Sequence, residues 1–114
     1  MFLPTVLAHH NTDQRLTLTL EIDPNIEFFK GHFNDAPIIP GVAQLYWVLE
    51  FYNEFFQPNT RPIISNVSTL KFQQVIPPHS KVELSLEYLQ SKNILIFSYA
   101  NDNAKFSSGK IALS

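Results

Sequence analysis

The segment from about Pro40 to about Phe56 constrains the fold most, because it predicts a long helix that is apolar on nearly every side. Its first half has only one polar residue, Gln44. Pro40 suits the start of a helix, where its missing N–H would lack a partner anyway, and Pro58 lies just beyond the predicted end. A helix of this kind has to be covered by other structure. Because the rest of the chain has strand patterns, we expect a sheet to cover it.

Strand patterns lie on both sides of this helix in the sequence. Leu16–Ile22 alternates leucine or isoleucine with polar residues, which is typical of a half-buried strand. Similar segments follow the helix at residues 63–72, 82–88, 94–100 and 104–113, with turn residues between them and Gly109 as a candidate bulge. This order predicts an α+β fold, in which a curled antiparallel sheet surrounds the helix and its free edge favours pairing with a second copy.

Length and composition exclude several classes of protein. A chain of 114 residues has room for one ordinary core, so we expect a single domain over residues 1–114. The formal charge of −2 and the lack of a basic run argue against nucleic acid as a partner. The absence of cysteine excludes disulfides and cysteine-ligated zinc, and agrees with a cytoplasmic protein. Pro4 and the lack of early basic residues predict no signal peptide, and no apolar run is long enough to span a membrane.

Residues 26–39 follow no period and predict a structured loop that carries a histidine close to the start of the helix. His32 lies between Gly31 and Phe33, nine residues before Gly41. An imidazole titrates near ~6.5 and can act as a general base. Amides at the start of a helix can hold negative charge that develops on an oxygen. Together the two groups would suit the removal of a proton next to a thioester carbonyl.

The residues of this loop and of the helix start resemble a known family. Gly31-His32-Phe33, Pro37-Ile38 and Pro40-Gly41-Val42 resemble the signature of the hotdog-fold 3-hydroxyacyl-[acyl-carrier-protein] dehydratases, and residues 70–78 resemble that family's strand and proline turn. The resemblance extends from about residue 16 to the end of the chain, and is greatest to the small dehydratases of aryl-polyene biosynthesis. It implies a hotdog fold, with one long central helix wrapped by the sheet. It also implies a homodimer, or a heterodimer with a sister dehydratase, in which the two sheets merge, and a higher oligomer is open as well.

The resemblance also implies an activity and a set of site residues. The reaction converts a 3-hydroxyacyl thioester into the trans-2-enoyl thioester, on acyl carrier protein or on coenzyme A, with no metal or cofactor beyond the carrier's phosphopantetheine arm. His32 would be the base, and the Gly41 N–H would hold the thioester oxygen. The implied substrate-binding residues are Phe33, Pro40, Val42 and Gln44. Phe33 would line the acyl tunnel, and Gln44 would either touch the substrate or cap backbone.

The chain departs from the family at Tyr46, where the relatives have a carboxylate that the other protomer contributes. Three outcomes are open: Tyr46 donates the proton to the leaving hydroxyl, Glu50 one turn later does so, or dehydration is lost and only thioester binding remains. Asp35 could orient His32 or be a solvated loop acid. Two rival functions follow. One is a thioesterase that activates water with Asp35 or Glu50, and the other is a catalytically reduced subunit that completes a sister dehydratase.

Basic residues are expected where an acidic carrier protein docks. The candidates are Lys30, Arg61, Lys71 and Lys105. Gln73 and Gln74 stand where the family often has arginines, which leaves coenzyme A thioesters open as substrates. The remaining histidines are predicted to be solvated loop residues, without the spacing of a metal site; they are His9, His10 and His79.

Overall fold

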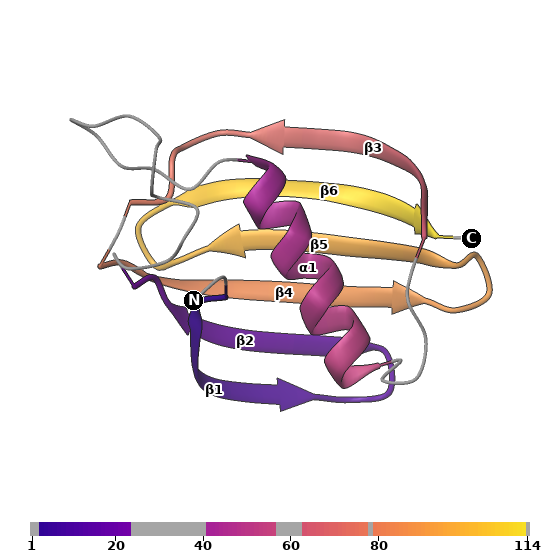
Figure 1. Ribbon diagram of the computed structural model, residues 1–114, viewed down its shortest axis with the longest axis horizontal. Coiled ribbons are helices and arrows are strands. Elements are labelled where there is room, and N and C mark those ends of the chain that lie inside the picture. Colours follow the sequence, from indigo (N-terminus) through magenta and orange to yellow (C-terminus); the bar gives the residue numbers. More distant parts are fainter. Residues whose placement is uncertain (1–2, 24–40, 57–62, 78, 114) are drawn as a thin grey trace.

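The computed structural model describes residues 3–23, 41–56, 63–77 and 79–113. It contains strands β1 (Thr5–Asn11), β2 (Arg15–Glu21), β3 (Ile64–Phe72), β4 (Lys81–Leu89), β5 (Ile94–Ala100) and β6 (Lys105–Leu113), and one helix, α1 (Gly41–Phe55). The strands form a single antiparallel sheet in the order β1-β2-β4-β5-β6-β3, and α1 lies across one face of it (Figure 1). This is the predicted hotdog arrangement, with a curled sheet that does not close.

The core lies between the sheet and one face of the helix. Leu16, Leu18 and Leu20 of β2 are fully buried, and the residues between them turn to the opposite face, as their alternation predicts. From the helix, the fully buried side chains of Trp47 and Val48 meet them. Each buried leucine or valine of this kind stabilises the fold by roughly 1.5–3 kcal/mol relative to leaving it in water. The spacing of apolar residues therefore fixes which face of each element turns inward.

The sheet covers only one side of α1. The buried helix residues recur every three to four positions and are Ala43, Gln44, Trp47, Val48, Phe51 and Tyr52. On the opposite side Val42 is 71% exposed and Tyr46 is 40% exposed. A single layer of strands contacts a helix along one stripe. The prediction that other structure covers the helix on every side is therefore wrong for the sheet: it leaves Val42 and Tyr46 exposed, whereas Leu45 and Leu49 pack against the edge of the core.

The prediction that His9 and His10 lie in a loop is wrong. Both lie in β1, where they pair with Leu18 and Thr17 of β2. The ring of His9 also lies 5.1 Å from that of Phe55, measured between centroids. The pairing of β1 shifts between Val6 and Ala8, so its residues do not alternate regularly. His79 is in an exposed turn, as predicted.

The predicted bulge at Gly109 lies on the neighbouring strand instead. Gly109 pairs in regular register with Phe97 of β5. The irregularity is in β3, between Ser68 and Lys71, where Thr69 has a positive φ of 53°. A Cβ atom on Gly109 would lie 2.9 Å from the Phe97 ring and 3.1 Å from Leu70. The glycine is therefore explained by close packing beside the bulge.

Candidate functional site

The first turns of α1 hold the predicted site residues that the structure describes. Gly41, Val42, Gln44 and Tyr46 all lie there. His32, Phe33 and Pro40 lie outside the described residues, as do Asp35, Lys30 and Arg61. The distance between His32 and the amide of Gly41, on which the predicted chemistry depends, therefore stays a prediction.

Gly41 begins the helix and lies against an aromatic ring. A Cβ atom at this position would be 2.6 Å from Cζ of Phe72, the last residue of β3, so a larger residue would have to displace the ring. Close packing against Phe72 therefore accounts for a glycine at this position. The amide groups of the first helical turn have no partner within the helix and lie at its electropositive end. No acidic side chain in that turn offsets this partial charge.

Gln44 is bound to the sheet by two hydrogen bonds. Its backbone oxygen accepts a bond of 2.7 Å from the hydroxyl of Tyr99, and its side-chain Oε1 accepts one of 2.6 Å from Oγ of Ser107. All three residues are buried. Burial raises the pKa of Tyr99 well above its usual value, so its hydroxyl keeps its proton and remains a donor. Tyr99 and Ser107 are not among the predicted site residues, because an inward-facing strand residue carries no sign of a partner far away in the chain.

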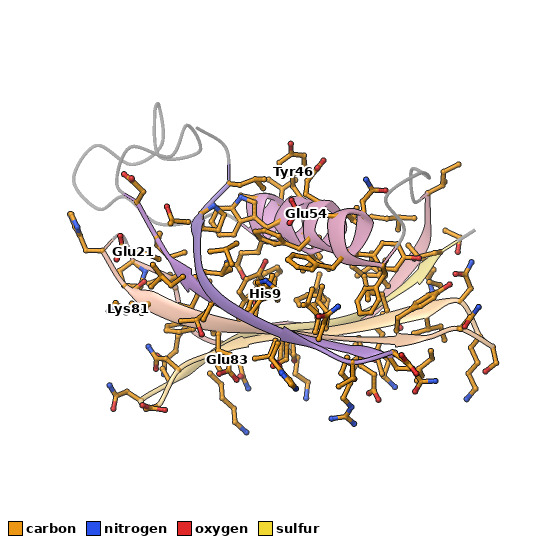
Figure 2. The ribbon with its side chains drawn as sticks, turned by 90° about the horizontal axis from the view of Figure 1, so that it is seen from below. His9, Glu21, Tyr46, Glu54, Lys81 and Glu83 are labelled. Carbon is orange, nitrogen blue, oxygen red and sulfur yellow. The ribbon has the colours of Figure 1, made fainter. Side chains whose placement is uncertain are left out.

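Tyr46 and Glu50 share the outward face of the helix with Val42. The three residues are spaced four apart, which places them on one stripe. Figure 2 shows Tyr46 on the side of α1 that faces away from the sheet. Both groups proposed to supply the missing acid are therefore on one face, beside the exposed Val42 at the start of the helix. Within the described residues, the sheet does not cover this face.

Two of the predicted docking residues come together at one end of the sheet. Lys71 of β3 and Lys105 of β6 line a cavity of about 360 Å³, together with Gln73. Ser98 and Ser108 also line it. The sequence did not indicate this cluster, because the two lysines are far apart in the chain and meet only through the pairing of β3 with β6.

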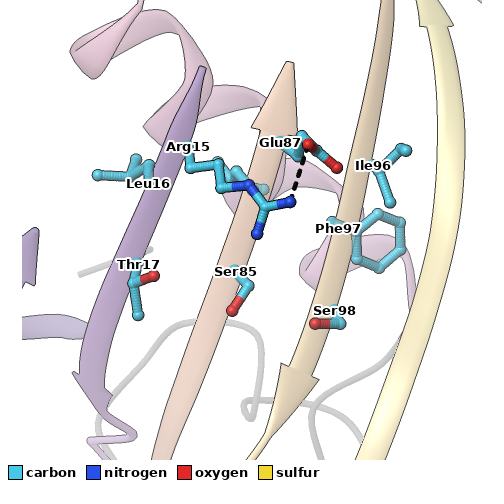
Figure 3. Close-up of a pocket in the computed structure, with 9 residues that line it drawn as sticks. Arg15, Leu16, Thr17, Ser85, Glu87, Ile96, Phe97 and Ser98 are labelled. Carbon is cyan, nitrogen blue, oxygen red and sulfur yellow. Dashed lines mark ion pairs between the residues drawn. The ribbon is translucent and has the colours of Figure 1, made fainter. Parts of the chain in front are cut away.

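A second cavity, of about 230 Å³, lies on the face of the sheet that is turned away from α1 (Figure 3). Arg15 and Glu87 form an ion pair of 3.2 Å beside it, and Thr17 and Ser85 are among its lining residues. Exposed pairs of this kind contribute only about 0–1 kcal/mol. None of the predicted site residues lines this cavity, so it is separate from the candidate site.

The part of the chain that the structure describes contains no group of three or more histidine or acidic residues placed to hold a metal ion. Within the same ranges, α1 is too short and not apolar enough to cross a lipid bilayer.

Comparison with known proteins identifies the family. A family model described as ApeI-like, ApeI dehydratase, matches residues 8–110. The chain belongs to the ApeI-like dehydratase family. The match includes the stretch from Gly31 to Val42 and the strand from Leu70, so the resemblance inferred from those motifs is confirmed.

Individual proteins named as dehydratases also match the chain. A solved chain of the dehydratase heterocomplex ApeI:P from Xenorhabdus doucetiae is 30% identical, with a TM-score of 0.88 and coverage of 96% of both chains. The 3-hydroxyacyl-[acyl-carrier-protein] dehydratase FabZ of Levilactobacillus brevis is 30% identical over 89 residues, which are 73% of this chain and 60% of that protein. FabZ of Clostridium perfringens is 27% identical over 109 residues, or 90% of this chain and 76% of that protein. The ApeI-like chain thus spans between about half and three quarters of the length of the FabZ relatives.

Proposed function

We propose that this ApeI-like chain is a hydro-lyase that dehydrates a 3-hydroxyacyl thioester carried by acyl carrier protein. A proton leaves carbon 2, the hydroxyl leaves carbon 3 and takes up a proton to form water, and a trans double bond forms between the two carbons. The observation that carries the proposal is the match of residues 8–110 to a dehydratase family. It includes both the histidine loop and the start of α1. The cytoplasm is the compartment we expect.

His32 and Gly41 have the central roles in this mechanism. His32 takes the proton from carbon 2, while the N–H of Gly41 donates to the thioester oxygen as negative charge develops there. The position of Gly41 at the electropositive end of α1 supports its role. Removing one donor of this type from comparable sites raises the barrier by roughly 3–4 kcal/mol. Phe33, Pro40 and Val42 would bind the acyl thioester beside these two groups.

Tyr46 is the residue we assign to protonate the leaving hydroxyl. The phenol hydroxyl can donate a hydrogen bond, so it suits the group that protonates the leaving hydroxyl. Its place on the side of α1 that the sheet does not cover supports this role, because in the family a partner subunit covers this part of the site. Glu50 lies one turn further along the same stripe and is the alternative donor.

A second hotdog subunit would complete the site. Strand β3 is an edge strand of the sheet, and Ile64, Leu70 and Phe72 on it are 39%, 39% and 50% exposed. A long edge with exposed apolar side chains tends to pair with another strand. We therefore expect β3 to pair with a second subunit, either the same chain or a sister dehydratase. The heterocomplex found for the Xenorhabdus doucetiae relative supports the sister alternative.

The carrier protein would dock at the cavity lined by Lys71 and Lys105. An acidic carrier is attracted to a basic cluster, and the gain falls as salt increases. Coenzyme A, whose phosphates are also anionic, remains an alternative carrier of the acyl group.

The test is hydration of a trans-2-enoyl thioester, which removes the ultraviolet absorbance of its conjugated double bond. The assay compares acyl carrier protein and coenzyme A substrates, with a thiol-detecting reagent in a parallel sample. Loss of absorbance without thiol release supports the dehydratase, whereas thiol release indicates a thioesterase. If neither occurs until a sister dehydratase is added, the chain is a catalytically reduced subunit. Tyr46 in place of the family's carboxylate is the observation that favours this second function.

A further inference from the structure

We propose that Tyr99 and Ser107 are positioning residues for the dehydration, because they fix the start of α1 through Gln44. The inference rests on the proposed function, in which the Gly41 N–H holds the thioester oxygen. Neither residue would touch the substrate. Their role would be to set where the first turn of the helix, and hence that amide, lies on the sheet.

The two residues form a cross-strand pair. Tyr99 of β5 lies directly opposite Ser107 of β6 in the register of the sheet, and both side chains face the helix. They bind the same helix residue, since Tyr99 donates to the backbone oxygen of Gln44 and Ser107 to its side-chain oxygen. The exposed fractions of Gln44, Ser107 and Tyr99 are 3%, 3% and 0%, so water does not compete for these bonds.

A third residue of the same row contacts the helix start. Phe72 of β3 pairs with Ser107 on its other side, and it is the residue whose ring lies against Gly41. Tyr99, Ser107 and Phe72 therefore lie side by side on the neighbouring strands β5, β6 and β3. Together they contact the first helical turn at its start, Gly41, and at its end, Gln44. Packing by Phe72 restricts how close Gly41 can come to the sheet. The two hydrogen bonds also fix the orientation of the turn, because hydrogen bonds are directional and packing contacts are not.

Directional contacts matter here because most of the helix rests on apolar side chains. Hydrophobic burial stabilises a helix on a sheet but depends weakly on small shifts along or around its axis. Hydrogen bonds weaken steeply when their angle or distance changes. Gln44 follows Gly41 by three residues, a rise of about 4.5 Å along the axis. Holding Gln44 therefore holds the Gly41 amide within one helical turn.

The sheet offers a matched control at the other end of the helix. The hydroxyl of Tyr88 donates a bond of 2.7 Å to Asn93, equal in length to the bond from Tyr99. The Tyr88 ring contacts Tyr52, in the C-terminal half of α1, with centroids 5.2 Å apart. Tyr88→Phe removes one hydroxyl from the same sheet and the same helix interface, but far from the first turn.

The experiment measures hydration kinetics of Tyr99→Phe, Ser107→Ala and Tyr88→Phe beside the wild type, with melting temperatures of all four. We expect Tyr99→Phe and Ser107→Ala to lower kcat by roughly ten- to a hundredfold with little change in KM, the range that a shift of about 1 Å in a reacting group can produce. Tyr88→Phe should lower the melting temperature comparably and keep kcat. Ser107→Thr, which retains the hydroxyl, should restore kcat. Equal kcat in the Tyr99 and Tyr88 variants would overturn the proposal.

A second readout does not depend on activity. Amide hydrogen exchange at residues 45–48 reports opening of the first helical turn, because these amides bond to the carbonyl groups of residues 41–44 in an α-helix. Exchange there should be faster in Tyr99→Phe than in Tyr88→Phe. If the wild type is inactive towards every thioester, the proposed function fails, and the exchange comparison alone decides whether Tyr99 holds the turn. Equal exchange in the two variants would reject that role.

Discussion

The ring of Phe72 occupies the space that a side chain on Gly41 would need, with its Cζ atom 2.6 Å from the position of a Cβ atom there. The contact joins the last residue of β3 to the first residue of α1. It explains, independently of any reaction, why the helix begins with glycine. The proposed chemistry needs only the backbone N–H at this position, which any residue except proline supplies, so substitutions can separate that requirement from the packing one.

Gly41→Ala should destabilise the protein only while Phe72 is present. Displacing the ring should cost about 1 kcal/mol, at the low end of the usual range for overpacking, because Phe72 is half exposed and can move. In a Phe72→Ala background the same change should cost nothing, because alanine favours the helix. Urea unfolding of the four proteins gives the coupling free energy, which we expect to be about 1 kcal/mol. If the effects of the two substitutions on the free energy of unfolding were additive, the contact between Gly41 and Phe72 would not contribute to stability.

His32→Ala should abolish hydration and leave the fold and the oligomer intact. Loss of a general base lowers rates by roughly a hundred- to ten-thousandfold. Size-exclusion chromatography and circular dichroism provide the structural control. Activity within a few-fold of the wild type would remove His32 from the mechanism.

Tyr46→Asp should keep or raise the hydration rate if this position faces the site. The residue is 40% exposed on the outward side of α1, so an aspartate there need not be buried. Glu54→Gln, further along the same helix on the exposed side, is the control and should change nothing. A folded Tyr46→Asp protein that is inactive or unaffected would direct attention to Glu50 or to a site without an acid.

Lys71→Glu and Lys105→Glu should raise KM for carrier-protein substrates, because both replace a cation at the cavity with an anion. The effect should shrink as salt increases, since ions screen exposed charges. Lys92→Glu, in the exposed turn between β4 and β5, is the matched control. The same KM increase in all three variants would indicate a response to net charge and not a docking site.

Stability should fall at high pH because of buried phenols. Burial raises the pKa of Tyr99 above its usual value of 10.0, and burial together with Tyr88 raises that of Tyr52. The folded protein therefore holds these protons more tightly than the unfolded chain does. Neither phenol changes the free energy of unfolding below about pH 10. Above that pH, ionisation in the unfolded chain lowers it by up to about 1.4 kcal/mol per pH unit for each group. Denaturant unfolding can be measured between pH 8 and pH 11 (roughly the range set by the free phenol). The free energy of unfolding should fall less steeply with pH in Tyr99→Phe than in the wild type.

The regular elements could be predicted because their evidence is local. The alternation of Leu16–Ile22 and the apolar run bounded by Pro40 and Pro58 indicate a strand and a helix, and the structure has β2 and α1 at these places. Strand β1 could not be predicted in the same way. It is an edge strand with an irregular register, and its exposed histidines have no apolar residues alternating with them.

The candidate site was predictable only as a set of motifs. Gly41 and Tyr46 follow from short segments, which a sequence displays directly. The bonds from Tyr99 and Ser107 to Gln44 connect residues 55 and 63 positions apart, and no local pattern marks them. Likewise, Lys71 and Lys105 share a cavity only because β6 lies beside β3.

The place of β6 in the sheet has a consequence for the order of assembly. Strand β3 has β6 as its neighbour, and Ser107, which binds Gln44, belongs to β6 as well. A nascent chain that has left the ribosome only as far as β5 can pair β1, β2, β4 and β5 and can offer Tyr99 to Gln44, yet it lacks Ser107 and the strand beside which β3 pairs. The bond from Ser107 to Gln44 and the pairing of β3 would then form only after β6 has been made, once the other four strands have already paired.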